Sequence, residues 1–309
     1  MTTRTPSEAP PRTGDGSRAG TGSPRVLNRA TFRQIVDRVH TVPSLPEVVT
    51  QVCRLINDPS SNAAQVHDIV KKDAAMAAKI LRMVNSVYYG LGQPVNDLEQ
   101  ALVIVGFKTI RSIALSISVI NMFQQQNACF SMKAFWTHSA VSAAICRLLA
   151  GRTKICDPEL AFVIGLLKDI GKLVLVENAP DECRAVIAVA KEFQYPFHRA
   201  AREVLQTNDA EIGAWLCEKW QLDPAIIEAV RDQYDLTREE RRPLVAMCQF
   251  VDYLCGLKNI KVSGDCGRPE LDPQVWDHLG LDKTALVEVL SVVNDEVDNA
   301  RQLLQLASS

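Results

Sequence analysis

A helical repeat of apolar residues runs through this chain from about residue 28 to its end, and it restricts the fold more than any other feature of the sequence. Segment 74–90 is representative, because Met76, Ile80, Leu81 and Val84 recur at the three- and four-residue spacing of one helix face. Similar short segments follow one another with short connections. Segments that alternate apolar and polar residues, as half-buried strands do, are nearly absent. The sequence therefore predicts an all-α fold built from many short helices.

Changes in composition divide the chain into parts. The first 25 residues are rich in Thr, Ser, Pro, Gly and Arg, and such a segment cannot offset the entropy that ordering it would cost. A polar stretch at 124–133 marks a seam between two helical halves. We therefore expect a disordered tail at 1–25, an N-terminal helical subdomain at 26–126 packed on a second helical subdomain at 127–257, and a loop with a C-terminal helix at 258–309.

Bulk composition excludes several classes of protein. The chain is 47% apolar, which suits a substantial core, and its net charge of −2 argues against a generally basic protein that coats nucleic acid. The nine cysteines are odd in number and form no CxxC pair, so we expect reduced thiols and neither disulfides nor a zinc site. We find no signal peptide and no apolar stretch long enough to cross a bilayer, and we therefore expect a cytoplasmic protein without a membrane partner.

The predicted C-terminal helix at 283–306 carries a narrow apolar seam. Its members are spaced by four, three, four, three and four residues: Leu286, Leu290, Val293, Val297, Ala300 and Leu304. One interpretation is a terminal helix that docks on its own domain. The other is a helix that pairs with a partner or with a second copy of the chain as a homodimer.

The first half of the chain contains an ordered series of short motifs. These are "VPSLPEVV", "INDPSSNAAQVHDIVKKDAAMAAKILRMVNSVYYG" and "LEQALVIVGFKTIRSIALS". The series resembles the HDOD domain, a bacterial all-helical signalling module related to the HD and HD-GYP phosphohydrolases, and the resemblance extends from about residue 38 to about residue 256.

Four polar residues of this first half are candidates for contacts with a ligand or partner. Arg82, Lys108 and Arg111 have the charge for a phosphate-bearing ligand, although ordinary solvated charges are the simpler interpretation. Asn85 is polar within an apolar stripe, and the simpler interpretation is that its amide bonds backbone at a helix junction.

The resemblance also implies a metal site, because enzymes of the wider HD superfamily bind divalent ions through a His, a His-Asp pair and a later Asp. His138, Asp169 and Asp252 match three of these positions, but Lys168 replaces the second histidine. A lysine ammonium has three donors and no lone pair, so it cannot ligate a metal unless its pKa falls, and neighbouring carboxylates oppose that fall. We hypothesise that Lys168 is an internal cation in a vestigial metal pocket. The alternative is that its side chain extends to solvent.

Other positions near the pocket also depart from the catalytic pattern. Asp209 stands where HD-GYP relatives have His, and Gln233-Tyr234 stands where they have His-His. Lys172 fits the catalytic pattern and is a further candidate contact.

From these residues and the resemblance we expect a protein that is not an enzyme. It would be a non-catalytic signalling scaffold with no cofactor and no metal, acting on signalling partners such as second-messenger or two-component proteins. A nucleic-acid partner is not indicated. Two alternatives stay open: a metal-dependent phosphohydrolase, and a sensor that binds a nucleotide or cyclic dinucleotide in the old pocket without turnover.

Overall fold

The described part of the chain is helical, as the sequence predicts. The computed structural model describes residues 32–38, 44–57, 62–124, 127–237, 242–267, 270–281 and 283–308, so the predicted tail at 1–25 lies outside the described residues. Within these ranges there is no strand, only an isolated bridge between Asn127 and Phe130. The helices in chain order are α1 (Phe32–Arg38), α2 (Glu47–Asn57), α3 (Ala63–Val70), α4 (Ala74–Val84), the 3-10 turn η1 (Val87–Tyr89), α5 (Leu98–Val105), α6 (Phe107–Met122), α7 (Met132–Thr153), α8 (Pro158–Leu167), α9 (Ile170–Asn178), α10 (Pro180–Phe193), α11 (Phe197–Leu205), α12 (Asp209–Lys219), α13 (Pro224–Asp232), α14 (Arg242–Leu257), α15 (Gln274–Leu279) and α16 (Lys283–Ser308).

Short polar side chains at the helix starts explain why so many separate helices form. Each accepts a hydrogen bond from a backbone N–H that the first turn leaves unpaired. The residues that do so are Asn62, Asp73, Asp97, Ser131, Asp157, Asn208 and Asp223. The sequence itself therefore marks where these helices begin.

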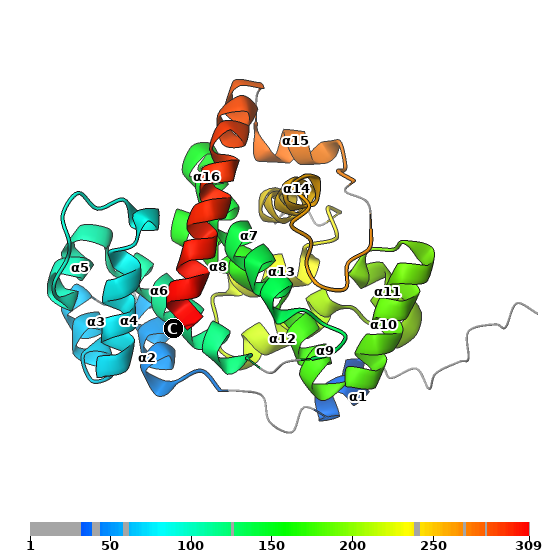
Figure 1. The fold of residues 1–309 in the computed structure, drawn as a ribbon, viewed down its shortest axis with the longest axis horizontal. Coiled ribbons are helices and arrows are strands. Elements are labelled where there is room, and N and C mark those ends of the chain that lie inside the picture. The colour runs from blue at the N-terminus through cyan, green and yellow to red at the C-terminus, as the bar shows by residue number, and fades with distance from the viewer. Residues whose placement is uncertain are drawn as a thin grey trace, which may run out of the picture.

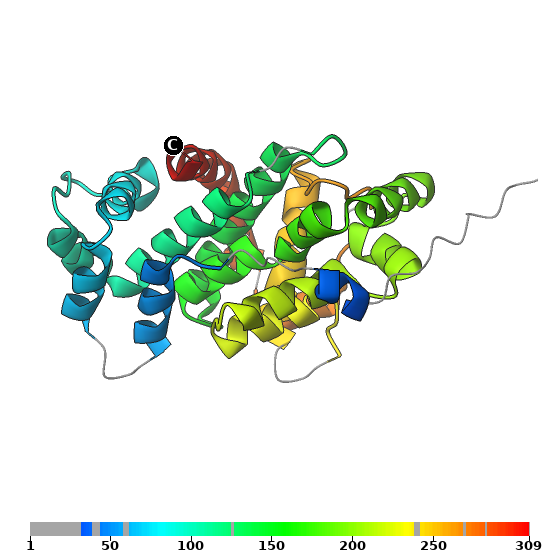
Figure 2. The same ribbon diagram turned by 90° about the horizontal axis from the view of Figure 1, so that it is seen from below.

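The two helical halves lie at opposite ends of an elongated molecule (Figures 1 and 2). Helices α2 to α6 form one end, and α7 to α15 form the other. One element departs from the predicted division: α1 packs against α9 and α12 of the second half, and its Ile35 is fully buried. The apolar spacing of this helix shows that one face is buried, but it carries no information about which surface covers that face.

Helix α6 is the buried spine of the N-terminal half, with nearly every residue from Thr109 to Ile120 hidden from solvent. No single helix in the described ranges has both the length and the apolar composition needed to cross a membrane. Helices α5 and α6 together satisfy both criteria, but the helix axis bends by 115° between them. All nine cysteines are free, as predicted.

Helix α16 lies across both halves, where it packs on α4, η1, α6 and α7 (Figure 1). Val293, Val297 and Ala300 of the predicted seam are buried, which supports docking within the chain. Leu290 of the same seam is 40% exposed and Val287 is 65% exposed. Leu286 of the seam lies outside the described side chains. Pairing with a second copy stays a prediction, and among the described side chains of α16 Val287 and Leu290 are the large apolar ones that are exposed.

Two glycines let the helices of the second half approach closely enough to form the site. A Cβ on Gly165 would lie 2.6 Å from the carbonyl oxygen of Ser142, so α8 contacts α7 directly there. A Cβ on Gly171 would lie 2.0 Å from the carbonyl oxygen of Asp209, where α9 meets α12. The Lys168-Asp169 turn between α8 and α9 is therefore fixed on both sides.

Candidate functional site: a buried lysine among three candidate metal ligands

Three residues far apart in the sequence converge in the second half. His138 comes from the middle of α7, Asp169 from the turn before α9, and Asp252 from α14. One ligand atom from each lies within 4.8 Å of the others. The structure thus brings together the three positions that the resemblance marks as metal ligands.

The ammonium of Lys168 occupies the centre of this group. Its Nζ lies 2.5 Å from Asp169 Oδ2, 2.6 Å from Asp252 Oδ1 and 3.2 Å from His138 Nε2. An ammonium has three N–H donors, of which two meet carboxylate oxygens, and the His138 ring nitrogen accepts the third when the ring is neutral. The Lys168 side chain is 0% exposed, so it does not extend to solvent as the alternative interpretation required.

His138 is held in the orientation that this arrangement needs. Its Nδ1 lies 2.8 Å from the carbonyl oxygen of Ile260, a distance at which Nδ1–H donates to that oxygen. Nε2 then faces Lys168 Nζ and also lies 3.2 Å from Asp252 Oδ1 and 3.4 Å from Asp169 Oδ2. Burial and the charge of Lys168 oppose protonation of the ring, but the pKa of His138 is held well above its usual value, with hydrogen bonds to both carboxylates among the causes.

A second layer of charge surrounds Asp169. The Lys172 ammonium donates to Asp169 Oδ1 and lies 2.7 Å from Asp209 Oδ2, and the Tyr234 hydroxyl donates to that same Asp209 oxygen at 3.0 Å. Gln233 Nε2 donates to the backbone carbonyl of Lys168 at 2.6 Å and so fixes the turn. Asp209, Gln233 and Tyr234, which stand where the resemblance implies further histidines, are thus part of the hydrogen-bond network around the two lysines.

The charges of this cluster hold each other in the ionised form. Burial opposes the charge on Lys168, but the carboxylates of Asp169 and Asp252 outweigh it and hold the lysine pKa well above its usual value. Burial likewise opposes ionisation of Asp169, but Lys168 and Lys172 hold its pKa well below the usual range. The pKa of Asp252 is also lowered, against burial, chiefly by Lys168.

This donor set does not fit a divalent metal. One imidazole and two carboxylates are a plausible set of ligands, but the site already holds a fixed positive charge within hydrogen-bonding distance of all three. A metal ion would have to displace this buried ammonium from its two carboxylate partners. No step of a metal-dependent reaction follows from these residues.

A cleft of about 530 Å³ opens above the cluster. The Asp252 side chain is 35% exposed at its floor, whereas His138 and Asp169 are nearly inaccessible. On one wall the His198 ring stacks on Tyr234, with their centroids 3.8 Å apart. No spacing or motif marks His198 in the sequence, because it reaches the site through the packing of α11 on α12.

The other predicted contact residues do not join this site. Asn85 exchanges two hydrogen bonds with the backbone of Val95, which agrees with its simpler interpretation. Lys108 Nζ lies 2.8 Å from Asp157 Oδ2, and this ion pair links α6 to the start of α8. Arg111 is buried in α6, and Arg82 is exposed near the end of α4. Of the five candidates, only Lys172 lies in the cluster.

The chain is similar to known proteins over most of its length. A model of the HDOD domain family matches residues 42–236. A protein of Treponema pallidum (strain Nichols), itself uncharacterized, is 23% identical over 224 residues, which is 71% of this chain and 43% of that protein. The cyclic di-GMP phosphodiesterase CdgJ of Vibrio cholerae serotype O1 is 25% identical over 207 residues, 62% of this chain and 46% of that protein. This chain therefore spans less than half the length of these curated relatives.

The fold has a close counterpart among solved structures. A crystal structure of an HDOD domain protein of unknown function from Geobacter sulfurreducens aligns with a TM-score of 0.77 at 23% identity, covering 88% of this chain and 96% of that one. At this level of identity the likeness shows the fold alone.

Proposed function

The chain belongs to the HDOD domain family, and on that premise we propose that it is a non-catalytic bacterial signalling scaffold that works in the cytoplasm through protein–protein contacts. The observation that carries the proposal is the position of Lys168 Nζ among His138, Asp169 and Asp252. The buried ammonium supplies the positive charge that a metal ion supplies in enzymes with this ligand pattern. The pocket is then a structural device that keeps three polar side chains paired inside the core.

The same ammonium opposes the phosphohydrolase alternative. Metal-dependent hydrolysis needs an ion that generates hydroxide and stabilises charge on phosphorus, and an ammonium does neither in the same way. The relative CdgJ is named a phosphodiesterase, but more than half of its length has no counterpart in this chain. Its activity therefore gives no direct support for hydrolysis here.

The sensor alternative has its own support in the 530 Å³ cleft above Asp252. Calorimetry against a nucleotide panel separates the two alternatives, since a sensor that uses this cleft should release or absorb heat that Asp252→Asn abolishes. A scaffold should give no such difference.

Metal analysis together with a hydrolysis assay tests the proposed function. The purified protein, incubated with Mn²⁺ or Fe²⁺ and then dialysed, should keep far less than one ion per chain and should not hydrolyse bis-p-nitrophenyl phosphate. The matched variant Lys168→His restores the missing ligand type and should retain more Mn²⁺ than the parent protein. A stoichiometric ion in the parent protein, with hydrolysis that Asp169→Ala abolishes, would contradict the proposal.

Partner contacts are tested by capture from the native host with the full chain as bait. Val287→Asp changes an exposed apolar side chain of α16 without touching its buried face. The variant should melt at the same temperature as the parent, and it should lose a partner or a second copy that binds through this helix. Unchanged capture and an unchanged oligomeric state would remove this helix face from the proposed interface.

A further inference from the structure

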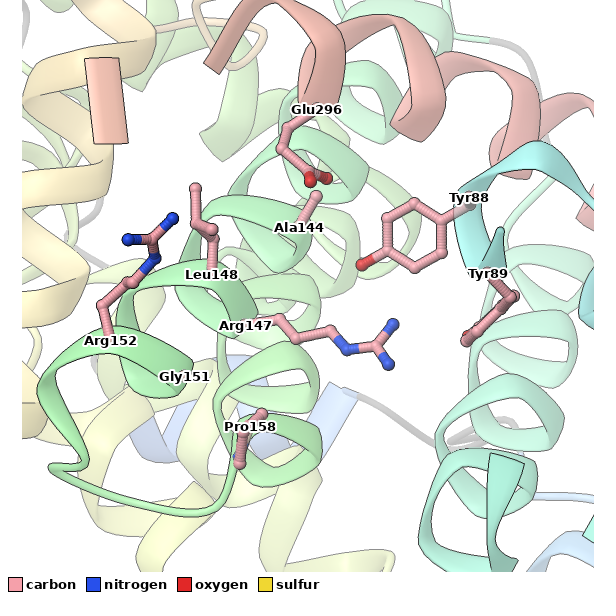
Figure 3. A pocket seen from close by; sticks show the side chains of 9 residues that line it. All are labelled: Tyr88, Tyr89, Ala144, Arg147, Leu148, Gly151, Arg152, Pro158 and Glu296. Atoms are coloured by element: carbon pink, nitrogen blue, oxygen red, sulfur yellow. The ribbon is translucent and has the colours of Figure 1, made fainter. Parts of the chain in front are cut away.

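A second cavity lies where the two halves and the C-terminal helix meet, and it shares no residue with the cleft above the Lys168 cluster. It measures about 430 Å³, within the range of about 300–1,000 Å³ that is typical of small-molecule sites. Figure 3 shows its walls: Tyr88 and Tyr89 of η1, the exposed side of α7, Pro158 of α8 and Glu296 of α16. None of these residues is among the candidate site residues predicted from the sequence.

The floor of the cavity is apolar, and two of its three residues are small. It is formed by Ala144, Leu148 and Gly151, which lie four and then three residues apart on one face of α7. A Cβ added to Gly151 would meet no heavy atom within 4 Å, so neither helix packing nor backbone conformation requires glycine there. Glycine is a poor helix former, and its presence here is explained if the space above it is used.

Two charged groups face each other across this floor. The Arg147 guanidinium lies 5.3 Å from the ring centroid of Tyr88 and 5.1 Å from that of Tyr89, and one of its nitrogens lies 2.9 Å from Glu159 Oε1. Tyr88 and Tyr89 are also hydrogen-bonded to Arg147, and because a guanidinium has five N–H donors, donors remain for another acceptor.

Glu296 differs from Arg147 in both charge and pairing. Its carboxylate extends from α16 toward the cavity (Figure 3), and among the described residues it has no hydrogen bond or ion pair. Burial raises the pKa of Glu296, and Arg147 only partly offsets this. The cavity thus offers donors on one side and an acceptor without a donor on the other.

We propose that this cavity binds the guanine base of a nucleotide. Guanine presents N–H donors on its Watson–Crick edge, which suit the Glu296 carboxylate, and the acceptors O6 and N7, which suit an arginine. Gly151 leaves space above the floor for a flat base, and the Tyr88 ring gives it an aromatic neighbour. Arg152 at the rim is 44% exposed, and a phosphate group that reached it would share its guanidinium with Glu288.

Calorimetry with the full chain and GMP tests the assignment, with AMP and inorganic phosphate as competitors of different chemistry. GMP should bind, and AMP should bind at least tenfold more weakly because it lacks the N2 amino group and O6. Glu296→Gln should weaken GMP binding at least tenfold, and Gly151→Leu should abolish it by filling the cavity. Cyclic di-GMP, tested in parallel, shows whether the base is accepted from a dinucleotide as well as from a mononucleotide.

The matched control is Asp298→Asn, which neutralises another carboxylate of α16 that points to solvent. It should leave the dissociation constant for GMP within twofold. Circular dichroism and the melting temperature verify that each variant is folded. The proposal is overturned if GMP does not bind, if AMP or phosphate binds equally well, or if folded Gly151→Leu still binds GMP. Lys168→His should leave GMP binding unchanged, so failure here is distinct from failure of the proposed scaffold function.

Discussion

Replacing Lys168 with methionine removes the positive charge between Asp169 and Asp252 while keeping most of the side-chain volume. The ammonium is 0% exposed and lies 2.5 Å from Asp169 Oδ2 and 2.6 Å from Asp252 Oδ1. Removing one partner of a buried ion pair costs about 3–5 kcal/mol, because the remaining charge loses its compensation in the core. Asp169 keeps Lys172, and Asp252 is 35% exposed, so we expect the lower end of this range, about 3 kcal/mol.

The pH dependence of this loss identifies its cause. In the parent protein the pKa of Asp169 lies below its usual value, so its ion pair contributes above the usual carboxyl pKa of about 3.9 and is lost as the pH falls through the lowered value. The pKa of Lys168 is raised, so its contribution persists through neutral pH and is lost only as the pH rises through that raised value. In Lys168→Met the uncompensated carboxylates take up protons more readily. The deficit should therefore be largest near pH 7 and shrink toward pH 4.

Urea unfolding followed by tryptophan fluorescence at pH 7.5, 6 and 4.5 measures the deficit, which is the difference in free energy of unfolding between the parent protein and Lys168→Met. The control is Lys71→Met, which removes an exposed lysine that is paired with Asp68 on the surface and should leave stability unchanged within error. A deficit below about 1 kcal/mol, or one that does not change with pH, would refute the internal-cation hypothesis, since a buried charge without a partner has to cost more than that.

Three further substitutions test how the chain holds its shape. Gly171→Ala should destabilise the protein by about 3 kcal/mol or more in urea unfolding, because its Cβ would meet the carbonyl oxygen of Asp209 at 2.0 Å. Gly151→Ala, in open space within α7, should instead raise the stability by up to about 1 kcal/mol, and equal effects of the two substitutions would contradict this account. Asn85→Ala removes both hydrogen bonds to the backbone of Val95 and should cost about 1–2 kcal/mol in thermal unfolding; a neutral result would mean that water replaces the amide.

The spacing of apolar residues and the polar helix caps are local properties, so the all-α fold and most helix boundaries follow from the sequence. Asn85 behaves as its local context predicts, as a hydrogen-bond partner of the backbone. The family motifs also identify His138, Asp169 and Asp252 as one group. These inferences need only the order of residues along the chain.

The tertiary structure alone decided where the Lys168 side chain points. The sequence shows an ammonium in place of an imidazole, but a long flexible side chain reaches either solvent or core, and the surrounding surfaces select between them. Close approach of α8 to α7 at Gly165, and of α9 to α12 at Gly171, seals the core around this lysine and places Asp252 within its reach. The same holds for α1 and for Glu296, whose neighbours come from distant parts of the chain, because packing between such segments depends on the shapes of whole surfaces and not on local spacing.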